Sequence, residues 1–121
     1  MNVIAPRALR VFAARFEEAE QPLRDWYNHL RRIEPEKFSD LRTHFNHVDI
    51  AKTQNDLTVF IFDVGGNKYR VICSLNFASN IAFIKLILTH QEYTFWNKQG
   101  RPLWAFNKFS IIGSNFKPQP K

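Results

Sequence analysis

The sequence predicts an α+β domain with two layers, in which N-terminal helices pack on one face of an antiparallel sheet. Two observations support this prediction. Apolar residues recur at helical spacing in the first third of the chain, and three apolar segments joined by two tight turns follow from residue 57. Helices that precede a run of strands tend to gather on one face of the sheet. The other face is then expected to lack a helical cover and to form the natural binding surface.

The N-terminal segment is expected to contain a short strand over residues 2–5, which joins the sheet, and then two helices. Pro6 and Pro22 each suit the first turn of a helix, where the missing N–H of proline is not needed. Glu34-Pro35 should stop the second helix, because the residue before a proline avoids the helical region. The two apolar stripes are Leu9, Phe12, Ala13 and Phe16, and then Leu23, Trp26, Tyr27, Leu30 and Ile33.

The segment between the helices and the strands is more polar. Ser39 can begin a short helix that runs through Phe45, and residues 46–56 are expected to form a surface loop. His44 and His47 make an H-x-x-H pair. Because this pair lacks cysteines or an H-E-x-x-H context, we expect no metal site there.

The strands are expected over residues 57–64, 68–77 and 81–90, with turns at 65–67 and 78–80. In the middle strand, alternation places Tyr69, Val71, Cys73, Leu75 and Phe77 in the core. The opposite phase shows Lys68 and Arg70 to solvent or to a ligand. A solvated sheet face explains these two cations equally well.

The third strand extends this cationic face. Its even positions, Ala82, Ile84, Leu86 and Leu88, are all apolar and are expected in the core, which places Lys85 beside Lys68 and Arg70 on the open face. Phe83 and Ile72 share that face. Cations mixed with aromatic and apolar groups suit a single-stranded nucleic acid, because phosphates need charge and bases need a flat surface.

Composition limits the class of protein. The chain has 121 residues, 45% of them apolar, so one domain with a single core is expected. A net charge of +6 favours an anionic partner such as RNA, DNA or an acidic protein surface. The single cysteine, Cys73, excludes an internal disulfide. The sequence shows no signal peptide and no apolar run long enough to cross a bilayer, so no membrane association and a cytoplasmic location are expected.

Three segments together resemble a known family. Residues 19–27 (AEQPLRDWY), 66–70 (GNKYR) and 89–93 (THQEY) are similar to the hallmark motifs of HigB-type toxins of the RelE superfamily. The resemblance implies a RelE-like two-layer fold and a type II toxin–antitoxin system. It also implies a metal-independent mRNA endoribonuclease (mRNA interferase) without cofactors that acts on the translating ribosome, and a HigA-type helix-turn-helix antitoxin as partner. The resemblance runs from the N-terminus to about Tyr93, and we expect a toxin domain over 1–95 and a C-terminal extension of unknown role over 96–121.

The resemblance also places candidate site residues. Lys68 and Arg70 fall where related toxins keep phosphate-binding cations, and His90 and Tyr93 fall near the terminal catalytic groups. The expected catalytic set is therefore Lys68, Arg70, His90 and Tyr93. Lys68, Arg70 and Lys85 are expected to contact RNA. The alternative is a non-catalytic module that binds RNA, the ribosome or the antitoxin, such as an inactive toxin relative that acts as an operon co-repressor.

Overall fold

The structure, a computed structural model, describes residues 1–102, which form one five-stranded sheet and several helices. The helices are α1 (Arg7–Arg15), the short 3-10 helix η1 (Glu17–Ala19), α2 (Glu20–Arg31), α3 (Phe38–His44) and α4 (His90–Lys98). The strands are β1 (Asn2–Ile4), β2 (Asp49–Lys52), β3 (Thr58–Val64), β4 (Tyr69–Asn76) and β5 (Ile81–Thr89). This architecture confirms the α+β class.

The sheet has the strand order β1-β5-β4-β3-β2. Strands β3, β4 and β5 form the expected antiparallel meander, and β1 joins its edge by pairing in parallel with β5. The turn between β3 and β4 uses the residues that tolerate positive φ: Gly65, Gly66 and Asn67 have φ values of 69°, 61° and 79°. A Cβ atom on Gly65 would lie 3.1 Å from the Tyr69 ring, so this position has little room for a side chain.

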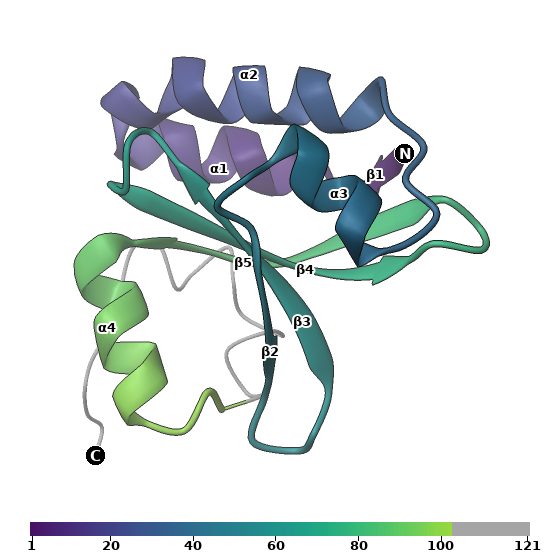
Figure 1. The fold of residues 1–121 in the computed structure, drawn as a ribbon. Coiled ribbons are helices and arrows are strands. Elements are labelled where there is room, and N and C mark those ends of the chain that lie inside the picture. Colours follow the sequence, from purple (N-terminus) through teal and green to yellow (C-terminus); the bar gives the residue numbers. More distant parts are fainter. Residues whose placement is uncertain (103–121) are drawn as a thin grey trace.

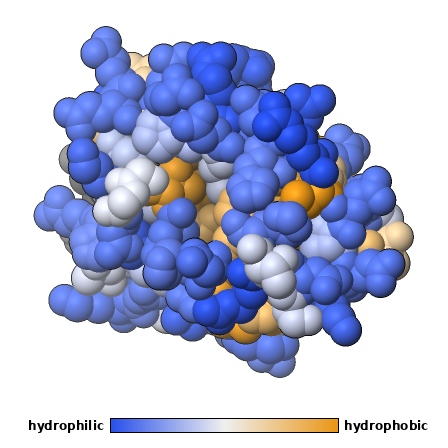
Figure 2. Space-filling model, turned by 45° about the horizontal axis from the view of Figure 1, so that its top comes forward, coloured by the Kyte–Doolittle hydropathy of each residue, from blue (hydrophilic) through white to orange (hydrophobic). Residues whose placement is uncertain are grey.

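Helices α1, α2 and α3 cover one face of the sheet (Figure 1). The expected inward phase of β4 is confirmed, because Tyr69, Val71 and Cys73 are buried in the core beneath these helices. The Cys73 thiol is fully buried, and that burial raises its pKa well above the usual range. Figure 2, which views the molecule tilted toward the helices, shows a mainly hydrophilic surface with apolar atoms gathered in small hollows.

The expectation of a loop over residues 46–56 is wrong in part, because Asp49–Lys52 forms strand β2. This strand pairs in antiparallel fashion with β3 at the edge of the sheet. Its side chains are mostly exposed, and Ile50 remains 51% exposed. A strand without a buried face has no alternating apolar pattern, which is why the sequence did not reveal it.

The expectation of an uncovered second face is also wrong. Helix α4 packs on the side of the sheet opposite to α1 and α2 (Figure 1). The anchor of α4 is Trp96, which is fully buried in a second cluster with Val59, Ile61, Ile72, Leu86 and Leu88. The third strand was expected to run to residue 90, yet His90 begins this helix. The domain therefore has a third, partial layer.

Strand β5 changes phase at its middle, which corrects the expected pattern of its faces. Cys73 pairs with Ile84 whereas Ile72 pairs with Leu86, so Lys85 has no partner in the register. A bulge of this kind shifts the alternation by one residue. Consequently Ile84 and Ile87 lie in the core beneath the helices, while Leu86 and Leu88 face α4. The expectation that all even positions of this strand share one core face is wrong.

The proposed division at residues 95 and 96 falls inside α4. Trp96 and Pro102, which lie beyond that boundary, are both buried, and the Trp96 indole donates a hydrogen bond to the Pro102 carbonyl at 3.4 Å. Residues 103–121 lie outside the described part of the chain, so the division into a toxin domain and a C-terminal extension stays a prediction. None of the helices found in residues 1–102 combines the length and apolar character that spanning a bilayer requires.

Candidate active site

The start of helix α4 fixes the position of His90. Thr89 is the N-cap: its hydroxyl accepts from the Glu92 N–H at 3.1 Å, and the Glu92 carboxylate accepts from the Thr89 N–H at 2.8 Å. This reciprocal pair is a capping box. The His90 N–H donates to the Lys68 carbonyl at 2.9 Å, which ties the helix start to the turn before β4. His90, which is exposed, thereby lies next to Lys68.

Arg70 lies at the centre of a network between the sheet and α4. Its Nε atom is 2.8 Å from Asp63 Oδ1, and its Nη1 atom donates to the carbonyls of Asn67 at 2.9 Å and Tyr69 at 3.3 Å. Its Nη2 atom is 3.3 Å from His90 Nδ1. The guanidinium carbon lies 4.9 Å from the centre of the Tyr93 ring. Arg70 therefore links Asp63, His90 and Tyr93 in one arrangement.

The two cations of the expected open face differ sharply in exposure. Arg70 is only 7% exposed, so the expectation that its charge faces solvent is wrong. The reason is that Asp63 pairs with Arg70 across the β3–β4 ladder, and α4 with Tyr93 covers the guanidinium. The Lys68 side chain, in contrast, is 65% exposed and lies 3.7 Å from Glu18 in η1. Of these two cations, Lys68 is the one that presents a solvent-facing charge beside His90.

A groove with a volume of about 750 Å³ opens between the α1–η1 junction and the start of α4. Its lining combines a cation, a histidine, a carboxyl and aromatic rings: Phe16, Lys68, Tyr69, Thr89, His90, Gln91, Glu92 and Phe95. Burial raises the pKa of the Glu92 carboxyl above its usual range, although the hydrogen bonds with Thr89 and the charge of Arg15 oppose that shift. We call this cavity the His90 groove. It is large enough to accept part of a nucleotide chain.

Lys85 does not belong to the His90 groove. It sits at the bulge of β5, and its ammonium group lies 5.6 Å from the centre of the Phe83 ring. Phe83 is 37% exposed, so the two side chains form a small patch of their own. A contact between Lys85 and RNA stays a prediction.

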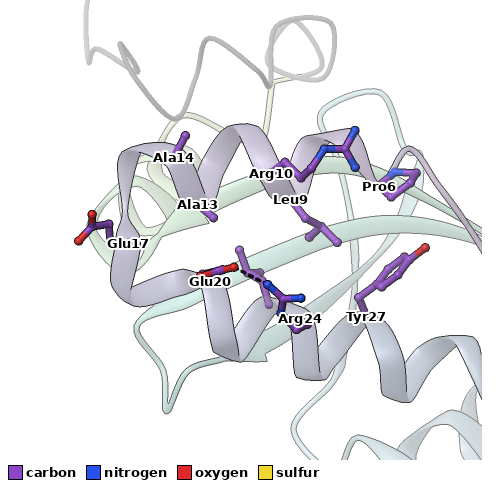
Figure 3. A pocket seen from close by; sticks show the side chains of 10 residues that line it. Pro6, Leu9, Arg10, Ala13, Ala14, Glu17, Glu20, Arg24 and Tyr27 are labelled. Atoms are coloured by element: carbon purple, nitrogen blue, oxygen red, sulfur yellow. Dashed lines mark hydrogen bonds and ion pairs between the residues drawn. The ribbon is translucent and has the colours of Figure 1, made fainter.

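A different groove, of about 550 Å³, runs between α1 and α2. Leu9 and Ala13 point from α1 toward α2, where Tyr27 faces them, and an ion pair joins Arg24 to Glu20 (Figure 3). No histidine lines this groove. Within residues 1–102, no cluster of three or more His, Cys, Asp or Glu side chains is placed to hold a metal ion. The His90 groove is therefore the better candidate for chemistry.

Sequence reasoning placed Lys68, Arg70, His90 and Tyr93 in one site, and the structure brings these residues together. It missed Asp63, and it missed the aromatic walls that Phe16 and Phe95 give to the groove. Two signals could have helped. Asp63 is a charged residue inside an apolar strand, and the spacing Thr89-x-x-Glu92 is the sequence signature of a capping box.

The comparisons with known proteins agree with the three motifs. A sequence model of the HigB_toxin family, the RelE-like toxic component of a toxin–antitoxin system, matches residues 19–96. The chain is 29% identical over 93 residues to the mRNA interferase HigB of Escherichia coli O6:H1, which covers 77% of this chain and 88% of that protein. It is 28% identical over 96 residues to the mRNA interferase toxin HigB of Escherichia coli K12, covering 79% and 90%. This chain therefore belongs to the HigB family of RelE-like toxins of toxin–antitoxin systems.

Proposed function

We propose that this toxin is an endoribonuclease that cuts mRNA on the translating ribosome and thereby inhibits translation. One observation carries the proposal: Lys68 and His90 line the same groove. The Arg70 guanidinium contacts the His90 ring through Nη2, and it lies over the Tyr93 ring. The names of its relatives, mRNA interferases, favour the same activity. As a member of a toxin–antitoxin family, the protein has an antitoxin partner. We further propose that this partner is a HigA-type protein with a helix-turn-helix domain.

The proposed reaction uses the RNA itself as the nucleophile. The ribose 2′-OH attacks the adjacent phosphorus, the bond to the 5′-oxygen of the next nucleotide breaks, and a 2′,3′-cyclic phosphate and a 5′-OH result. This route requires no metal. It requires an acceptor for the 2′-OH proton, a donor for the leaving oxygen and positive charge near the phosphate.

The groove supplies groups for two of these roles, the positive charge and the proton donor. Lys68 is placed to attract the phosphate, because its ammonium group is exposed beside His90. His90 is the candidate donor or proton-transfer group, and Tyr93 positions Arg70 through ring contact. The half-buried rings of Phe16 and Phe95 give bases an apolar surface on which to stack. A single-stranded message therefore fits the groove better than a duplex does.

The function is tested by inducing the protein in bacteria with and without its antitoxin and mapping mRNA 5′ ends. We expect growth arrest and new 5′ ends inside coding regions, both suppressed by the antitoxin. The variant His90→Ala is the matched control. Growth arrest without new 5′ ends would support a non-catalytic binding module instead. Comparing purified protein on free mRNA and on translating ribosomes then establishes whether the ribosome is required.

Lys68→Ala is expected to weaken RNA or ribosome binding and to reduce its dependence on salt. The loss of one phosphate contact should lower the slope of log K against log salt by about 0.7, the value for single strands. Salt-titrated binding measures the change. Lys37→Ala is the control, because Lys37 is exposed at the start of α3 and does not line the His90 groove. Equal slopes of log K against log salt for the two variants would show that Lys68 does not contact the RNA.

Glu18→Gln is expected to act in the opposite direction. The Glu18 carboxylate lies 3.7 Å from the Lys68 ammonium, where it competes with an incoming phosphate. Removing its charge should therefore strengthen RNA binding modestly, by about two- to fivefold at low salt, and the gain should fade as salt screens the charge. Binding measured at two salt concentrations checks this. Weaker binding by Glu18→Gln would mean that Glu18 positions Lys68 rather than competing for it.

A further inference from the structure

Arg70 is held too firmly by the protein to serve as a free phosphate clamp. Each of its guanidinium nitrogens has a protein partner: Asp63 at Nε, two backbone carbonyls at Nη1 and His90 at Nη2. One face of the group lies against Tyr93, and the residue is only 7% exposed. A group with these partners is suited to hold other side chains in place.

The contact with His90 constrains where the imidazole carries its proton. A guanidinium can donate hydrogen bonds but cannot accept them, and it stays charged at any ordinary pH. The His90 Nδ1 atom, 3.3 Å from Nη2, must therefore be the acceptor. An imidazole that accepts at Nδ1 is neutral and keeps its proton on Nε2. Protonating Nδ1 would place two hydrogen-bond donors, His90 Nδ1–H and Arg70 Nη2–H, opposite each other and break the contact.

Asp63 is the residue that fixes Arg70 for this task. The two residues are directly opposite in the β3–β4 register, so their side chains leave the sheet on the same face. Asp63 is the exposed exception in a strand whose neighbouring residues are buried. Its carboxylate neutralises the guanidinium and holds Nε, which leaves Nη2 aimed at His90.

We propose that Asp63 is a positioning residue that acts through Arg70 to hold neutral His90 with its proton on Nε2. This inference rests on the proposed nuclease function for its catalytic meaning. His90 then offers a hydrogen-bond donor to the phosphate or to the leaving 5′-oxygen. It does not take the 2′-OH proton, so that proton goes to another group, on the toxin or on the ribosome. In serine proteases a carboxylate sets the tautomer of the catalytic histidine by direct contact. Here the carboxylate would act on the histidine through an arginine that lies between them.

The first test measures the tautomer directly and does not depend on RNA cleavage. Long-range ¹H–¹⁵N correlation spectra of the full-length ¹⁵N-labelled protein report which ring nitrogen carries the proton, and His90→Gln assigns the signals among the four histidines. We expect the Nε2–H form for His90 in the wild type. We expect Asp63→Ala to shift His90 toward a mixture of tautomers. A wild-type His90 with its proton on Nδ1 would overturn the proposal, as would an unchanged tautomer in Asp63→Ala.

The second test measures cleavage by the same proteins. Asp63→Ala should lower the single-turnover rate by roughly 10- to 100-fold with little change in RNA affinity, a smaller loss than removing a carboxylate that touches the imidazole itself. Asp63→Asn keeps an acceptor oxygen for the Arg70 Nε atom. It should therefore recover part of the wild-type tautomer signal and part of the cleavage rate. Glu20→Gln is the matched control, because it removes a carboxylate that pairs with an arginine, Arg24, outside the His90 groove, and it should leave both the tautomer and the cleavage rate unchanged.

The outcomes separate this proposal from the nuclease function. If the wild type shows the Nε2–H tautomer and Asp63→Ala disturbs it, but neither protein cuts RNA, the nuclease function fails while the positioning role stands. If RNA is cut at the full rate by Asp63→Ala, the positioning role fails while the function stands. Should Asp63→Ala fold poorly, Asp63→Asn and the wild-type spectrum still decide the question.

Discussion

Replacing His90 with alanine is expected to slow RNA cleavage by about 10²–10⁴-fold while leaving RNA or ribosome binding within a few-fold of the wild type. The reason is that His90 lines the groove as the group proposed to donate at the reacting phosphate, whereas the exposed charge of Lys68 beside it stays in place to attract the phosphate. His90 is exposed at the first position of α4, and its N–H bond to Lys68 involves only the backbone. The fold should therefore survive the change.

Single-turnover cleavage and equilibrium binding on purified His90→Ala measure the two effects separately. His90→Gln sharpens the result, since its amide can offer a donor near the place of Nε2. If His90 acts as a neutral donor, the glutamine variant should lose less than the alanine variant. Equal losses in both would indicate that His90 transfers a proton fully. Unimpaired cleavage by His90→Ala would show that His90 has no part in the mechanism. Tyr93 or a ribosomal group would then be the candidate for proton transfer.

Replacing Arg70 with alanine is expected to abolish toxicity and also to destabilise the fold. From the strand phase alone one would expect only the loss of toxicity, but Arg70 is buried and paired with Asp63 at 2.8 Å. Breaking a buried pair costs about 3–5 kcal/mol, and a smaller cost of roughly 2 kcal/mol applies here because Asp63 can still reach water. For a chain of this size that lowers the melting temperature by about 8–10 °C.

Thermal unfolding of Arg70→Ala and of the double variant Asp63→Ala/Arg70→Ala isolates the cause. Removing both partners leaves no uncompensated carboxylate, so the double variant should be more stable than Arg70→Ala alone. It should remain inactive, because His90 has still lost its partner at Nδ1. An Arg70→Ala protein with wild-type melting temperature and full cleavage would show that the network has no role in either stability or chemistry.

Much of the fold follows from local patterns in the sequence. The helical stripes, the Gly65-Gly66-Asn67 turn and the alternation along β4 each depend on interactions between near neighbours, and the structure confirms them. The three motifs also sufficed to place the chain in its family and to select Lys68, Arg70, His90 and Tyr93. Local spacing was enough because each motif lies within a short stretch of the chain.

Other features depend on contacts between distant segments, and only the tertiary structure decided them. The bulge at Lys85 arises from how β5 pairs with β4, and it sends Leu86 and Leu88 to the face that α4 covers. Helix α4 could be suspected from its capping box, but its docking depends on a site for Trp96 formed by three strands. Strand β2 forms at a sheet edge where neither face is buried, so no periodic signal marks it.

The functional meaning of Arg70 is the clearest case of this division. The sequence by itself determined that an arginine stands on the polar phase of β4, in a motif that resembles one of HigB-type toxins and lies within the segment that the family model matches. It did not determine what surrounds that arginine, because Asp63 comes from the neighbouring strand and His90 and Tyr93 come from α4. Burial and hydrogen-bond partners are properties of the assembled fold. They turn a residue expected to face solvent into one that holds the site together.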